Sequence, residues 1–140
     1  MRQARIVGVP LGYREDMTHV STTDLDRVLA SLDPQPSGTY VFSLVDEIPQ
    51  GVDFFAVIRD EDGYTVVVEQ EIAREAGINA DELYTRIDLG SSTELAAIGI
   101  TASIAQILAA RSITANFIAC RRHDHLFVQP DRAQEASALL

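Results

Sequence analysis

The chain has 140 residues, of which 46% are hydrophobic and 23% charged, so we expect one globular domain or two very small ones on a shared core. Its formal net charge of −10 repels phosphate backbones and anionic lipids, which argues against nucleic acid and membrane surfaces as partners. No apolar run approaches the ~20 residues of a bilayer span, so we expect neither a signal peptide nor a membrane anchor. The single cysteine, Cys120, excludes an internal disulfide, and we expect a cytoplasmic protein.

The beginning of the chain predicts an extension, a helix and a strand. Residues 1–21 contain a short apolar run and are interpreted as an N-terminal extension that adds an edge strand. A helix is predicted over residues 24–31, because leucine and valine side chains recur there on one helical face. Proline and glycine end this helix, and residues 40–45 are dense in β-formers, which predicts a buried strand.

A hairpin followed by a helix is predicted next. Residues 54–59 and 64–68 are two apolar runs that flank a turn ending in an Asp-Gly pair at Gly63. That pair supplies the positive φ angles of a tight hairpin. The helix is predicted over residues 69–76, and Gly77 occupies the usual position just past a helix end.

The second half repeats this arrangement after a strand and a longer helix. Residues 83–89 alternate like a half-buried strand, and isoleucine and leucine recur at helical spacing over residues 100–108. A second hairpin is predicted from residues 115–120 and 126–128, and a terminal helix over residues 131–140.

An internal duplication relates the two hairpin-and-helix units. Residues 68–76 and 128–136 share a valine, an acid, two alanines and a glutamate in register. The second copy reads β-α-β-β-α, which is one strand short of the ferredoxin-like βαββαβ plan. The missing strand must come from the first half, from the extension or from another subunit.

Three segments carry a family resemblance. Residues 99–104 open the long helix with the pattern Gly-x-x-Ala-x-Ile, residues 113–128 form a strand, a turn and a strand, and residues 39–42 follow a short helix. These features resemble aspartokinase-type ACT domains. Over residues 24–140 the chain is similar to a family of small bacterial tandem ACT-domain proteins of unassigned function.

The resemblance implies an α+β ferredoxin-like ACT fold made of two interlocked ACT-like halves. The halves are predicted over residues 22–82 and 83–140, after the extension at 1–21. ACT domains, as the resemblance implies, bind amino acids or similar metabolites at domain interfaces and transmit occupancy to enzymes.

The predicted ligand site combines the start of the long helix with the end of a hairpin strand. Backbone N–H groups at a helix start can approach a ligand carboxylate only where no side chain intervenes, which Gly99 permits. Asp124 could pair with a ligand cation or be an ordinary turn residue, and Gly99 could simply allow close packing of strand and helix. The predicted ligand-binding residues are Ile98, Gly99, Ile100, Thr101, Ala119, Cys120 and Asp124.

This site departs from the family pattern. The family usually reads Gly-Tyr-Tyr-His-Asp-His where this chain has Cys-Arg-Arg-His-Asp-His over residues 120–125. Two arginines therefore replace two tyrosines beside the predicted site. The additional cations favour a more acidic ligand.

The same segment contains residues that suggest metal binding or thiol chemistry. His123 and His125 could hold a metal from one side of a strand, or form a hydrogen-bonded turn pair. The metal alternative is disfavoured because the two histidines supply only two ligands and the neighbouring arginines repel a cation. Cys120 could be a nucleophile, or a small core residue on an apolar strand. We predict no metal, no cofactor and no catalysis.

Three hypotheses follow from the sequence. The first is a non-catalytic sensor module that binds an amino acid or similar metabolite and forms a homodimer through exposed sheet edges. The second is a structural or partner-binding domain with a vestigial pocket. The third is a metal or thiol enzyme at Cys120, His123 and His125.

Overall fold

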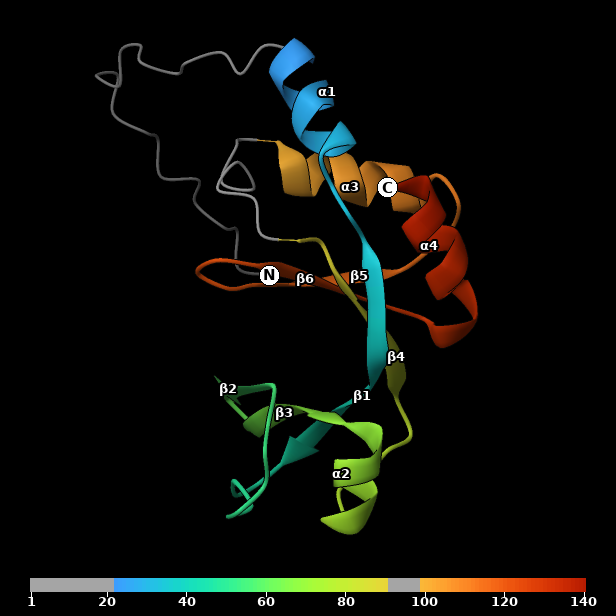
Figure 1. Cartoon of the computed structure of the whole chain (residues 1–140). Coiled ribbons are helices and arrows are strands. Elements are labelled where there is room, and N and C mark those ends of the chain that lie inside the picture. Colours follow the sequence, from blue (N-terminus) through green and yellow to red (C-terminus); the bar gives the residue numbers. More distant parts are fainter. Residues whose placement is uncertain (1–21, 91–98) are drawn as a thin grey trace, which may run out of the picture.

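The computed structural model of the protein describes residues 22–90 and 99–140 (Figure 1). The predicted extension over residues 1–21 therefore lies outside the described residues. The elements follow one another as α1 (Thr22–Ala30), β1 (Gln35–Val45), β2 (Ala56–Asp60), β3 (Gly63–Glu69), α2 (Gln70–Glu75), β4 (Leu83–Asp88), α3 (Ile100–Ala109), β5 (Ala115–Ala119), β6 (Asp124–Val128), the short 3-10 helix η2 (Pro130–Arg132) and α4 (Ala133–Leu139).

All six strands form one antiparallel sheet in the order β2-β3-β1-β4-β6-β5. The first half of the chain contributes β2, β3 and β1, and the second half contributes β4, β6 and β5. The pair β1–β4 joins the two sets, so each set borrows its fourth strand from the other. The ferredoxin-like ACT fold in two interlocked halves is confirmed, and β1 from the first half supplies the missing strand.

The predicted duplication is present in three dimensions. Hairpin β2–β3 leads into α2, and hairpin β5–β6 leads through η2 into α4. Because β4 pairs with both β1 and β6, the two halves share their central strands. The boundary between residues 82 and 83 stays a prediction.

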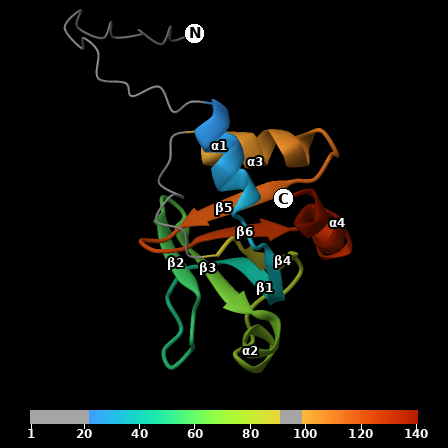
Figure 2. The same ribbon diagram turned by 45° about the horizontal axis from the view of Figure 1, so that its top comes forward.

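The helices cover one face of the sheet. Val41 lies opposite Val68 on β3 and Leu83 on β4, and Ile87, four residues further along β4, lies opposite Leu126 on β6, so these side chains share a face. Helix α2 packs there against β1 and β3, whereas α1, α3 and α4 gather over the second half (Figure 2). Burial of these apolar side chains drives the docking of the helices.

The other face of the sheet carries an aromatic cluster, which we define as Tyr40, Phe42, Phe55, Tyr84 and Phe127. Phe127 is fully buried at its centre, with its ring centroid 5.1 to 5.8 Å from those of Phe42, Phe55 and Tyr40. Phe55 immediately precedes β2, yet its ring lies 5.0 Å from that of His125 on β6. The sheet therefore curls so that this face is concave.

Strand β1 extends further than the sequence predicts. It begins at Gln35, whereas the prediction began at Tyr40 and assigned Pro36 and Gly38 to the end of a helix. The strand tolerates these two residues because its register against β4 shifts between Pro36 and Thr39.

The β2–β3 hairpin is confirmed, but its turn differs from the expected one. Asp60 pairs with Gly63, so Gly63 is the first residue of β3 and the two turn residues precede it. Gly63 has φ 136°, and a Cβ at this position would lie 2.6 Å from the carbonyl oxygen of Val45. Glycine is therefore required here by both conformation and space.

Two of the positive-φ glycines of the first half, Gly63 and Gly77, give a matched pair for mutation. We expect Gly63→Ala to lower the free energy of unfolding by about 2–4 kcal/mol, because strain and a backbone clash combine. Gly77 has φ 69° and open space around it, so Gly77→Ala should cost about 1–2 kcal/mol from conformation alone. Urea unfolding of both variants measures the difference, and equal losses would contradict the role of the Val45 carbonyl.

Candidate functional site

The start of α3 provides free backbone donors. Gly99 precedes the helix with φ 95° and ψ −7°, the first turn contains no acidic residue, and no side chain caps it within the described residues. Thr101 is exposed, but the side chain of Ile100 is only 1% exposed and belongs to the core, so Ile100 can offer a ligand only its backbone. Ile98 lies outside the described residues.

Gly99 is required by its conformation. A Cβ built there would meet none of the described atoms within 4 Å, so the alternative of close strand-to-helix packing is wrong. Residue types other than glycine rarely adopt the positive φ that Gly99 has.

The hairpin side of the predicted site is built from β5 and β6. Ala119 ends β5 and pairs with Asp124, the first residue of β6. Asp124 is therefore a strand residue, and the turn-residue alternative is wrong. Cys120 is an exposed free thiol just beyond β5, so its assignment to the core is also wrong. The backbone N–H of Cys120 donates to the carbonyl of His123 over 3.0 Å and closes the turn.

The fold brings the two parts of the predicted site to the same end of the molecule. The start of α3 and the β5–β6 turn lie on the same side in both views (Figures 1 and 2). The backbone N–H of Leu89, at the end of β4, donates to the carbonyl of Asp124 over 3.3 Å. This link fixes the start of β6 beside the end of β4.

A polar group occupies the concave face beside the aromatic cluster. The guanidinium carbon of Arg86 lies 5.0 Å from the ring centroid of Tyr40 and 5.2 Å from that of Phe55, and Arg86 also donates to the hydroxyl of Ser37 over 2.8 Å. These contacts hold the cation against two ring faces. Arg86 thereby tethers β4 to β1 and to the segment before β2.

The two histidines, His123 and His125, lie against each other. Their rings stack with centroids 6.3 Å apart, and His123 Nδ1 lies 3.8 Å from an Asp88 carboxylate oxygen. Across residues 22–90 and 99–140, no three or more His, Cys, Asp or Glu side chains are grouped so that they could hold a metal ion. The arrangement is a packed histidine pair beside one carboxylate.

Burial lowers the pKa of His125 below its ordinary value of 6.5. The side chain lies against Phe55, and the residue is only 8% exposed. Asp88 and Asp124 favour the charged form, while Arg86 and His123 oppose it, and desolvation is the largest effect. His125 is therefore held neutral near pH 7.

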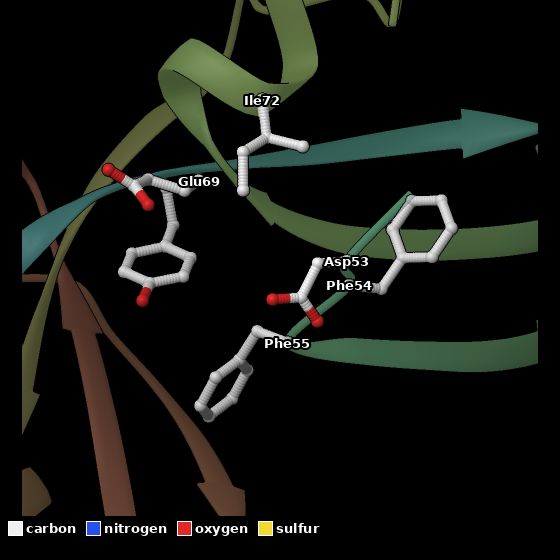
Figure 3. A pocket seen from close by; sticks show the side chains of 6 residues that line it. Asp53, Phe54, Phe55, Glu69 and Ile72 are labelled. Carbon is white, nitrogen blue, oxygen red and sulfur yellow. The ribbon is translucent and has the colours of Figure 1, made fainter. Parts of the chain in front are cut away.

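A separate cavity of about 300 Å³ opens between α2, the end of β3 and the segment before β2. Figure 3 shows the carboxylate of Asp53 pointing into this space, with Glu69 and Ile72 across from it and Phe55 below. The lining residues are Tyr40, Asp53, Phe54, Phe55, Glu69 and Ile72. The cavity thus combines apolar walls with two carboxylates.

Sequence reasoning missed this cavity. Its residues come from four separate segments with no shared spacing, and only the fold brings them together. The one signal in the sequence is the acidity of the first half: residues 22–88 carry 15 acids and 4 arginines.

Comparisons with known proteins identify the family. Two family models, each described as an ACT domain, match residues 21–85 and 79–140. A solved structure of a Vibrio cholerae protein of unknown function, described as a possible transport protein, is 36% identical, with 84% of this chain and 93% of that chain covered and a TM-score of 0.74. No functionally curated protein matches the chain by sequence.

Two more distant structures share the fold. A protein from Agobacterium tumefaciens is 18% identical over 77% of this chain and 85% of that one, with a TM-score of 0.63. An aspartate kinase from Clostridium acetobutylicum is 15% identical over 76% of this chain and 32% of that one, with a TM-score of 0.50.

The chain belongs to the ACT-domain family and contains two tandem ACT domains, which confirms the resemblance seen in the sequence. ACT domains generally serve regulation by binding small-molecule ligands. None of the described helices is long and apolar enough to cross a membrane.

The lowered pKa of His125 predicts acid sensitivity. Above pH 6.5 both the folded and the unfolded chain keep this imidazole neutral; below it the unfolded chain binds a proton that the folded chain resists. Stability should therefore fall as pH drops from about 7 toward the lowered pKa. We expect His125→Gln to reduce this slope by up to about 1.4 kcal/mol per pH unit.

Urea unfolding at a series of pH values measures this slope. His123→Gln is the matched control, because it leaves His125 in its buried position and should retain most of the slope. A slope in His125→Gln equal to that of the unmodified protein would show that His125 is not the titrating group.

Proposed function

We propose that this chain is a non-catalytic regulatory module that binds an amino acid or a similar small metabolite in the cytoplasm. Membership of the ACT family supports the regulatory class. The observation that carries the ligand proposal is the start of α3, which no described side chain caps and which lies on the same side as the β5–β6 turn. Backbone N–H groups at a helix start bind carboxylates, and Asp124 offers a counter-charge for a ligand ammonium.

The proposed site therefore binds the two charged groups of an amino acid at two separate positions. The carboxylate binds at the N–H groups that follow Gly99, near Thr101, and the ammonium binds at Asp124. Ala119 and the thiol of Cys120 border the ligand from the end of β5. Ile100 contributes only its backbone, because its side chain is buried, and Ile98 of the proposed site lies outside the described residues. Arg121 and Arg122 follow Cys120 and are exposed, which favours a ligand with an additional acidic group.

A thermal-shift screen of amino acids tests the function, because a ligand that binds only the folded state raises the melting temperature. For a stabilising ligand, we expect Asp124→Asn to weaken binding by about 1.5–3 kcal/mol, because it removes a charge-assisted hydrogen bond. Asp131→Asn makes the same change at an exposed position in η2 and is the matched control. Gly99 is a poor position for this test, since its φ angle strains any replacement.

The thiol of the single cysteine provides a second experimental test of the same site. Cys120 is exposed, so a thiol reagent should modify it in the free protein, and a ligand bordered by Cys120 should slow the reaction severalfold. Unchanged affinity in folded Asp124→Asn, together with no protection of Cys120, would remove this site from consideration.

We also propose that the protein forms a homodimer. Among the described residues the sheet ends in β2 and β5, and four of the five residues of β2 are exposed, so we expect the outer backbone groups of β2 to pair with another copy. Light scattering at micromolar concentration should give about twice the mass of the chain. A monomer at this concentration would contradict the proposal.

A further inference from the structure

The cavity between α2 and the segment before β2 has a chemistry different from that of the α3 site. Asp53 and Glu69 place two exposed carboxylates at its border, and within the described residues neither is in an ion pair or a side-chain hydrogen bond. Tyr40, Phe55 and Ile72 form its apolar walls. A cavity with free acceptors and apolar walls fits a ligand with a cationic head and an aliphatic stem.

We propose that this cavity binds an aliphatic amine or diamine that carries no carboxylate. The ammonium donates to a carboxylate at the cavity border, that of Asp53 or that of Glu69, and the methylene stem packs against Phe55 and Ile72. An α-amino acid fits less well, because its own carboxylate would meet two others. A volume of about 300 Å³ holds a chain of several methylene groups.

The charge of the surroundings supports a cation. Arg86 is the basic group held against Tyr40 and Phe55, but it is not among the lining residues, and its guanidinium donates to Ser37. The acidic excess of residues 22–88 attracts cations toward this half of the molecule. The two carboxylates therefore outweigh the one arginine behind the rings.

The cavity is distinct from the α3 site. Its residues come from β1, β3, α2 and the segment before β2, whereas the α3 site belongs to α3, β5 and β6. The two sites can thus be tested with different probes and different variants. A negative result here leaves the amino-acid proposal standing, because Asp124→Asn tests that one.

Titration of the full chain with cadaverine and n-pentylamine, followed by calorimetry or NMR chemical shifts at low salt, tests the proposal. We expect both amines to bind and n-pentanol, which has the same stem without charge, not to bind. L-Lysine should bind more weakly than cadaverine, because it carries a carboxylate. This comparison distinguishes an amino acid from a free amine as the ligand. Added salt should weaken amine binding.

Paired variants locate the binding. Asp53→Asn with Glu69→Gln should weaken cadaverine binding about tenfold, as expected for two partly solvated ion pairs. Glu61→Gln with Asp62→Asn makes the same charge change at the exposed β2–β3 turn and should change affinity less than about twofold. All four side chains are exposed, so the variants should keep the fold, which circular dichroism checks.

Three results would overturn the proposal. The first is no binding of cadaverine at millimolar concentration. The second is equal binding of n-pentanol and n-pentylamine, which would mean that charge plays no part. The third is an equal loss in both variant pairs, which would show that the amine responds to the general acidity of the surface rather than to this cavity.

Discussion

The antiparallel pairing of β1 with β4 is the constraint on which the rest of the structure depends. Within residues 22–90 and 99–140, neither half contains enough strands to complete a four-stranded ferredoxin-like sheet, and this pair lets each half complete the other. Without it, β1 and β4 would expose their backbone groups in the middle of the protein, which is costly for buried N–H and C=O groups. The two ACT domains are therefore one cooperative unit rather than two independent ones.

Joining the halves also creates the concave face. Six strands with the usual twist curl far enough to bring Phe55, at one edge, against His125 on β6. Phe127 fills the centre of this face, and Arg86 is held between two rings on the same side. This packing explains why a histidine and an arginine are tolerated there: the arginine is stacked and hydrogen-bonded, and the histidine stays neutral.

The two proposed binding sites lie in halves of the chain that differ in charge. The α3 site lies in the half with balanced acids and bases and offers helix N–H groups to a carboxylate. The cavity at Asp53 and Glu69 lies in the acidic half and offers carboxylates to an ammonium. β1 and β4 connect the two halves, and with them the two proposed sites, through one sheet.

The sequence by itself determined the elements, because their signals are local. Apolar periodicity set α3 and the hairpins, and Gly77 marked the end of α2. The duplicated pattern with the ACT resemblance predicted the fold, which is confirmed, and the α3 site, which stays a proposal. The tertiary structure decided what depends on distant pairing: β1 as the missing strand, Cys120 as a surface thiol and the required conformation of Gly63. It alone assembled the cavity, because Asp53 and Glu69 share no spacing and line one cavity only when the segment before β2 and the end of β3 fold beside α2.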